Sequence, residues 1–127
     1  MTTILLADDN QAIRESLAIR LKKHGYSVAL ACNGLEAVEE AAGGDFALIL
    51  MDLNMPELDG LEAAEQIRQN EQTAHVPIIA LTAYALPEDP LRARESGFND
   101  FHTKPVDFER LLQQIQSLIE IGQTTAW

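Results

Sequence analysis

Four short apolar runs of this sequence are each followed by polar groups that could do chemistry. These groups are the carboxylates of Asp8, Asp9 and Asp52, the hydroxyl of Thr82 and the ammonium of Lys104. Carboxylates held together repel one another, and a hard divalent cation such as Mg²⁺ removes that repulsion. Carboxylates, a cation, an ammonium and a hydroxyl together suit a phosphoryl group, and a carboxylate can attack phosphorus to form an acyl phosphate.

Asp52 is the candidate nucleophile. It follows the unbroken apolar run 46–51, which is typical of a strand buried on both faces, and Pro56 soon ends the extended segment. Taken alone, a carboxylate here could simply cap a turn. The other polar groups favour a chemical role, because the carboxyl ends of parallel strands form the ligand-binding edge of open α/β sheets.

The elements that must position these groups alternate along the chain. Strands are expected at 4–7, 28–31, 46–51, 76–82 and 98–102. Between and after them we expect five helices. Asp9 or Asn10 caps the first helix, Asn33 the second and Asp107 the fifth. The third helix carries Leu61, Ala64 and Ile67 on one face, and the fourth starts at or after Pro87. This alternation predicts a single α/β domain, residues 1–127, with a parallel sheet.

Composition excludes several classes of protein. A net charge of −11 argues against direct nucleic-acid binding, and we find no apolar segment long enough for a membrane span and no signal peptide. We therefore expect a soluble, cytoplasmic protein. The single cysteine, Cys32, rules out an internal disulfide and is expected to be a small core residue. His24, His75 and His102 lack metal-site spacing and are expected to be surface or ordinary polar residues.

Four motifs in order carry a family resemblance: Leu6-Ala7-Asp8-Asp9-Asn10, Met51-Asp52-Leu53-Asn54-Met55-Pro56 with Asp59-Gly60, Ala80-Leu81-Thr82-Ala83, and Thr103-Lys104-Pro105. Together they resemble the signature of two-component response-regulator receiver domains, including single-domain chemotaxis regulators. The resemblance covers nearly the whole chain. It implies a flavodoxin-like, doubly wound, five-stranded parallel sheet of order 2-1-3-4-5, flanked by five helices.

The resemblance also implies roles for site residues. Asp52 would be the phosphoacceptor, and Asp8, Asp9, Asp52 and the backbone carbonyl of Asn54 would hold Mg²⁺, with Mn²⁺ also plausible. The phosphoryl oxygens would be contacted at Thr82, Ala83 and Lys104.

Other roles concern switching and lifetime. Phe101 would move inward with Thr82 on activation, and the Lys104–Pro105 peptide bond would be cis. Asn54 and Tyr84 stand two residues beyond Asp52 and Thr82. We expect them to tune the lifetime of the phosphoryl group, with Tyr84 as a partial lid.

The function expected from the resemblance is that of a phosphoacceptor. Its phosphoryl donor would be a histidine kinase or a histidine phosphotransfer protein. The phosphorylated form would signal to an unknown downstream protein through the face made by the fourth helix, the fifth strand and the last helix. It would not be an enzyme beyond catalysing its own phosphorylation and dephosphorylation.

Alternatives remain. The chain could be a receiver module excised from a hybrid histidine kinase. A phosphatase of the haloacid-dehalogenase type also phosphorylates an aspartate at a strand end, but it needs a second Asp where this chain has Asn54. A flavodoxin-like FMN carrier would not place two carboxylates after the first strand, and no Gly-rich Walker loop is present.

Overall fold

The computed structural model of this chain describes residues 2–53, 55, 57–83 and 97–124. In this part of the chain, strands and helices follow one another in the order β1 (Thr3–Ala7), α1 (Gln11–Lys23), β2 (Ser27–Ala31), α2 (Gly34–Gly43), β3 (Leu48–Asp52), α3 (Gly60–Gln69), β4 (Ile78–Thr82), β5 (Asp100–Thr103) and α5 (Phe108–Thr124). The helix expected to start at or after Pro87 lies outside the described residues, as do Asn54, Pro56 and Tyr84.

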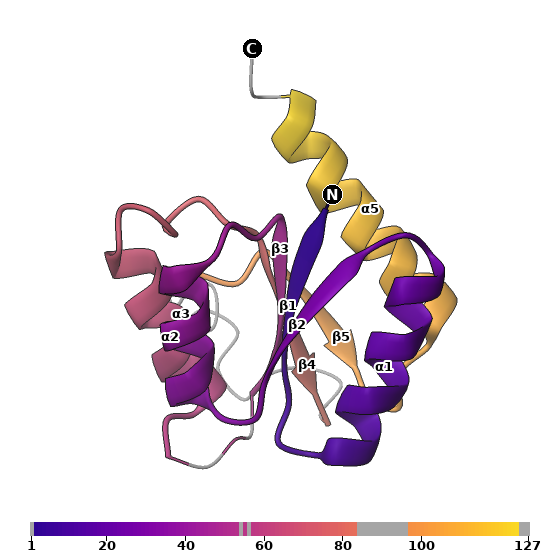
Figure 1. Ribbon diagram of the computed structural model, residues 1–127, viewed down its shortest axis with the longest axis horizontal. Coiled ribbons are helices and arrows are strands. Elements are labelled where there is room, and N and C mark those ends of the chain that lie inside the picture. Colours follow the sequence, from indigo (N-terminus) through magenta and orange to yellow (C-terminus); the bar gives the residue numbers. More distant parts are fainter. Residues whose placement is uncertain (1, 54, 56, 84–96, 125–127) are drawn as a thin grey trace.

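The five strands form one parallel sheet in the order β2-β1-β3-β4-β5. Helices α2 and α3 cover one face of the sheet, while α1 and α5 cover the other (Figure 1). The doubly wound flavodoxin-like fold is therefore confirmed. Because all strands run the same way, their carboxyl ends meet at one edge of the sheet.

The core has two halves because successive strand side chains point to opposite faces. Leu5, Ile49 and Ile78 belong to the half packed beneath α2 and α3. Their chain neighbours Ile4, Leu48 and Ile79 belong to the half beneath α1 and α5. Every residue of β3 and β4 is buried, which explains their unbroken apolar sequences.

Strand boundaries differ from the sequence-based expectation by a few residues. β3 starts at Leu48 rather than at 46 and ends with Asp52 itself. β4 starts at Ile78, because Pro77 has no N–H to donate and contributes only its carbonyl, which accepts from the Ile49 N–H at 2.9 Å. β5 spans Asp100–Thr103 instead of 98–102.

Short polar side chains begin the helices, at the predicted positions for α1, α2 and α5 and at Asp59, which was not predicted as a cap, for α3. Asn10, and not Asp9, caps α1, because its side-chain oxygen accepts from the Ile13 N–H at 3.1 Å. Asn33 and Asp59 cap α2 and α3 in the same way. Asp107 accepts from the Arg110 N–H at 3.3 Å, in the first turn of α5.

Arg68 joins three segments at the end of the sheet opposite the carboxylates. Its guanidinium donates to the backbone oxygens of Ala74, Val76 and Gly97 and to the side chain of Asn99. Burial lowers the pKa of this guanidinium. Gly97 adopts φ +101°, and a β-carbon there would lie 2.6 Å from the Arg68 side chain, so the two residues fit each other.

The structure corrects the expectation for Cys32 and decides between the two alternatives expected for His102. Cys32 is half-buried rather than in the core, since it follows the edge strand β2 at the rim of the sheet. Its N–H donates to Glu36 at 3.0 Å, and hydrogen bonding to Glu36 raises the pKa of its thiol. His102 is not a surface residue: its relative exposure is 0%, beneath α5.

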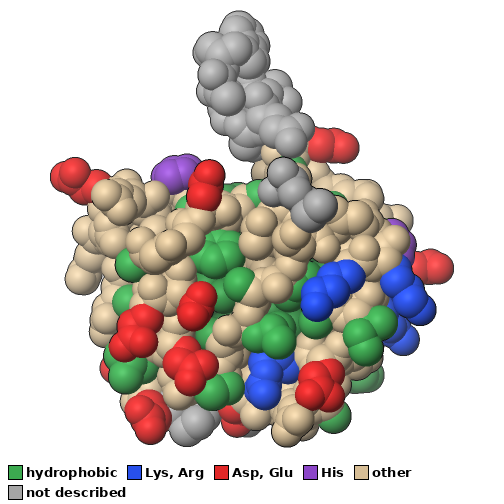
Figure 2. Space-filling model, in the orientation of Figure 1, with side chains coloured by type: hydrophobic (Ala, Val, Ile, Leu, Met, Phe, Trp, Pro, Cys, Tyr) green, Lys and Arg blue, Asp and Glu red, His purple; other side chains and the backbone are tan. Residues whose placement is uncertain are grey.

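Charge is distributed unevenly over the surface. α1 carries four basic residues and one acidic residue, whereas α2 carries three glutamates and no basic residue. Figure 2 shows basic side chains gathered over α1 and acidic ones over α2, on either side of an apolar region. Within the described ranges, no helix combines the length and the apolar character that crossing a membrane requires.

Candidate functional site

Asp8 and Asp52 occupy equivalent places on neighbouring strands. Asp52 ends β3 and Asp8 immediately follows β1, and the two strands pair directly, with Ala7 beside Met51. Asp8 follows Ile4 and Leu6, and Asp52 follows Leu48 and Leu50, at every second position, so both carboxylates lie on the face of the sheet that α1 and α5 cover. Their relative exposures are 0% for Asp8 and 3% for Asp52, which is unusual for acidic groups unless they are paired.

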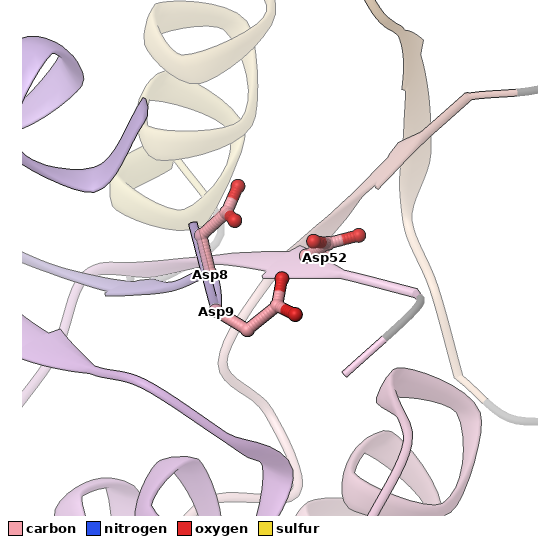
Figure 3. A group of neighbouring side chains, drawn as sticks. All are labelled: Asp8, Asp9 and Asp52. Carbon is pink, nitrogen blue, oxygen red and sulfur yellow. The ribbon is translucent and has the colours of Figure 1, made fainter. Parts of the chain in front are cut away.

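Asp9 completes an acidic group at this edge. One carboxylate oxygen from each of Asp8, Asp9 and Asp52 lies within 4.8 Å of the others. In Figure 3 the carboxylates of Asp8 and Asp9 project from the end of β1 toward that of Asp52. Oxygen ligands at this spacing, two of them buried and one exposed, fit Mg²⁺, which binds a few carboxylates and keeps several waters.

Lys104 supplies the positive charge. Its ammonium nitrogen lies 3.2 Å from Oδ2 of Asp52 and 3.3 Å from Oδ2 of Asp8. Burial lowers the pKa of this ammonium, but attraction to the two carboxylates outweighs burial and leaves the pKa above its ordinary value. The Lys104 N–H donates to the Thr82 carbonyl at 2.6 Å, and the Lys104–Pro105 peptide bond is cis.

The loop after β1 is held by Asn10 and by Arg14, a residue that the sequence analysis did not single out. Nη1 of Arg14 donates to the backbone carbonyl of Asp8 at 2.7 Å, and the Asn10 N–H donates to Oδ1 of Asp8 at 2.9 Å. The bond from Arg14 holds the backbone at Asp8, and the bond from Asn10 orients the Asp8 carboxylate. The available signal in the sequence was a basic residue in the first turn of the first helix, five positions after Asp9.

Gly60 allows the chain to fold closely around the candidate nucleophile. A β-carbon at Gly60 would lie 2.4 Å from the Asp52 carbonyl oxygen and 2.8 Å from Cα of Leu53. The Gly60 N–H donates to the Leu53 carbonyl at 3.1 Å. The start of α3 is therefore packed against the backbone that carries Asp52.

Thr82 and Phe101 lie on the opposite side of the sheet from His102. Thr82 is 1% exposed and ends β4, while Ala83 after it is exposed. Phe101 pairs with Ala80, the residue two before Thr82, so the three side chains share a face. The Phe101 ring is partly buried, with its centroid 6.0 Å from that of Phe98.

The structure thus brings together Asp8, Asp9, Asp52 and Lys104, and places Thr82 and Ala83 at the end of the next strand. Asn54 and Tyr84 lie outside the described residues. A pocket of about 290 Å³ opens beside Lys104. Ile13, Ser16, Leu17 and Arg20 of α1 form one wall, and Pro105 and Val106 form the other.

Comparison with known proteins supports one family. The sequence model of the response regulator receiver domain matches residues 4–116. The DNA-binding dual master transcriptional regulator RpaA of Synechocystis is 34% identical over 94% of this chain and 49% of its own length. The CAI-1 autoinducer sensor kinase/phosphatase CqsS of Vibrio cholerae is 38% identical over 91% of this chain and 17% of its own length. The chain therefore spans about half of the first relative and a smaller part of the second.

Solved structures agree. The receiver domain of sensor histidine kinase PA1611 from Pseudomonas aeruginosa, determined with magnesium in its active-site cleft, superposes with a TM-score of 0.87 at 38% identity, covering 94% of this chain and 98% of that one. The chemotaxis protein CheY4 of Vibrio cholerae gives 0.88 at 32% identity, covering 93% and 98%. With its sheet order, its acidic edge and these matches, the chain belongs to the response regulator receiver domain family of two-component signalling.

Proposed function

We propose that this chain accepts a phosphoryl group on Asp52 in a Mg²⁺-dependent reaction, with a histidine kinase or histidine phosphotransfer protein as donor. The observation that carries this proposal is the contact of one ammonium, Lys104, with the carboxylate of Asp52 inside a cluster of three carboxylates. In the proposed reaction an oxygen of Asp52 attacks phosphorus and forms an O–P bond. The P–N bond to the donor imidazole breaks, and its electron pair returns to the imidazole nitrogen.

The metal would be held by Asp9, Asp8, Asp52 and the backbone carbonyl of Asn54. When bound, Mg²⁺ supplies charge that offsets the carboxylates and the phosphoryl oxygens. Lys104 would neutralise one phosphoryl oxygen, while Thr82 would donate its hydroxyl to a second oxygen and Ala83 its N–H. These assignments follow from the family and from the placement of the residues at one edge of the sheet.

The donor would approach over α1. The pocket beside Lys104 is lined by apolar residues of α1 and of the turn after β5, together with Ser16 and Arg20. Among the helices that the structure describes, α1 is the one with more basic than acidic residues. A protein that brings a phosphohistidine to Asp52 needs such an adjacent contact surface.

The match to the kinase CqsS also supports the alternative that the chain acts as the receiver module of a hybrid kinase.

The proposal is tested with acetyl phosphate, a small-molecule phosphoryl donor, and Mg²⁺. Wild type should gain phosphate in an alkali-labile acyl linkage, and Asp52→Asn should lose it because an amide is a poor nucleophile. Asp59→Asn is the matched control: it makes the same change seven positions along, and asparagine still caps α3. Labelling of Asp52→Asn at the wild-type level would reject Asp52 as the acceptor.

A further inference from the structure

His102 is a buried histidine with both ring nitrogens occupied. It lies on β5 and faces α5, with a relative exposure of 0%. Nε2 lies 3.1 Å from the backbone nitrogen of Asp107, and Nδ1 lies 2.7 Å from Oε1 of Gln114. One imidazole therefore reaches the residue before α5 and the middle of that helix.

The partners fix which nitrogen carries the proton. A backbone N–H can only donate, so Nε2 must be the bare, accepting nitrogen. Nδ1 then carries the proton and donates to the Gln114 oxygen. The amide of Gln114 is oriented accordingly, since its nitrogen donates to the Phe101 carbonyl at 2.8 Å and to Oδ2 of Asp100 at 2.9 Å.

The bond from Asp107 to His102 closes the turn that carries Lys104. Residues 103–106 run from the last residue of β5 toward α5, and the ring joins His102 and Asp107, the residues on either side of this segment. Within the turn, the Lys104 N–H is held by the Thr82 carbonyl at 2.6 Å. The ammonium of Lys104 then reaches Asp52 at 3.2 Å.

We propose that His102 is a positioning residue, whose neutral Nδ1–H imidazole fixes the Lys104 turn and so places the Lys104 ammonium over Asp52. The role in phosphorylation rests on the function proposed above. The positioning itself does not, because it concerns contacts within the chain. A residue that held only the hydrophobic core together would need neither an acceptor facing Asp107 nor a donor facing Gln114.

Two amide substitutions separate these contacts. His102→Gln can place an accepting oxygen near the position of Nε2 and keep the bond to the Asp107 N–H. His102→Asn is too short for that bond but can still donate to Gln114. The variants carry the same functional group and no charge, so the difference between them reports on the bond that closes the turn.

The first measurement needs no phosphoryl donor. Hydrogen exchange followed by NMR should show that the Asp107 and Lys104 amides keep their protection in His102→Gln and lose it in His102→Asn. Long-range nitrogen–proton spectra of the wild-type ring should show a protonated Nδ1 and a bare Nε2. Equal protection of both amides in the two variants, or a proton on Nε2, would overturn the positioning role.

The second measurement couples the turn to chemistry. With acetyl phosphate and saturating Mg²⁺, His102→Asn should be phosphorylated on the order of tenfold more slowly, since small misplacements of a charged group are costly, whereas His102→Gln stays near wild type. In a Lys104→Met background, His102→Asn should cause no further loss. An equal loss in that background would show that His102 does not act through Lys104.

If wild type itself takes no phosphoryl group, the proposed function fails, and the hydrogen-exchange measurement still decides whether His102 positions the Lys104 turn.

Discussion

The ammonium nitrogen of Lys104 lies 3.2 Å from Oδ2 of Asp52, a residue 52 positions earlier in the chain. Both groups are largely withdrawn from solvent, with side-chain exposures of 20% and 5%. The contact joins the turn after β5 to the end of β3 across the intervening strand β4. It makes the charge on Lys104 matter for stability as well as for phosphoryl binding.

The first prediction concerns alkaline pH. Because attraction to Asp52 and Asp8 outweighs burial and raises the pKa of Lys104 in the folded state, the folded protein holds this proton more tightly than the unfolded chain. The resulting stabilisation is complete below the unfolded pKa of about 10.4 and is lost as pH rises through the folded value. Without Mg²⁺, the stability difference between wild type and Lys104→Met should therefore be largest near neutral pH and shrink above about pH 10.

This measurement should be made with Tyr26→Phe in both proteins. Burial is the larger cause, and the charge of Glu120 the smaller, of a raised pKa at the Tyr26 phenol. Ionisation of this phenol would therefore also lower the stability of the folded protein in the same pH range, which would obscure the effect of Lys104. Urea unfolding at several pH values gives the comparison. A difference between the two proteins that is independent of pH would show that the charge on Lys104 contributes nothing.

The second prediction concerns metal binding. A cation that binds only the folded state should stabilise the protein by about 2.7 kcal/mol when its concentration is one hundred times Kd. Thermal unfolding should thus show a rise in Tm with Mg²⁺, and Asp9→Ala should weaken the response. Asp45→Ala is the control, because Asp45 is an exposed carboxylate just before β3, at the other end of the sheet. Superimposable Mg²⁺ titrations for Asp9→Ala and wild type would remove Asp9 from the metal site.

The third prediction tests the close approach at Gly60. A methyl group there would overlap the Asp52 carbonyl, so Gly60→Ala should destabilise the fold by about 1–3 kcal/mol and slow phosphorylation. Gly43→Ala, in the last turn of α2, meets no atom within 4 Å and should be neutral or slightly stabilising. Equal effects of the two substitutions on urea unfolding would contradict the packing argument.

The fourth prediction concerns the proposed switch. Thr82 and Phe101 share a face of the sheet, and drawing the Thr82 hydroxyl toward a phosphoryl oxygen should open space that the Phe101 ring can fill. Phenylalanine has no hydroxyl to keep in water, so an inward ring position should already be populated without phosphate. NMR of the Phe101 ring should change on adding beryllofluoride with Mg²⁺. The change should persist in Thr82→Ser, which keeps the hydroxyl, and diminish in Thr82→Ala. A ring environment insensitive to beryllofluoride would count against the coupling.

The strands and the acidic edge could be predicted because they follow from local pattern. An unbroken apolar run such as 48–51 must be buried on both faces, and a parallel sheet then brings the carboxylate that follows it to the same edge as Asp8. Capping residues such as Asn33 were predictable for the same reason, since a cap bonds within its own first turn.

Partnerships between distant residues could not be predicted in this way. His102 is the buried residue of a short, mostly polar strand, and the sequence around it does not indicate that Gln114 and Asp107 will complete its hydrogen bonds. Arg68 reaches Gly97, which is 29 positions away and belongs to a different connection. Such contacts depend on the three-dimensional placement of side chains that the hydrophobic pattern does not encode.

The ends of the fold have a practical consequence for attaching other molecules. β1 begins and α5 ends on the side of the sheet away from the carboxylates (Figure 1). A fluorescent reporter or a surface tether joined at either end would leave the approach to Asp52 open. A reporter joined after α5 would stand at the far end of a helix that is preceded by Asp107, the residue bonded to His102 next to the Lys104 turn. In such a fusion, a change at Asp52 would reach the reporter as a displacement of α5.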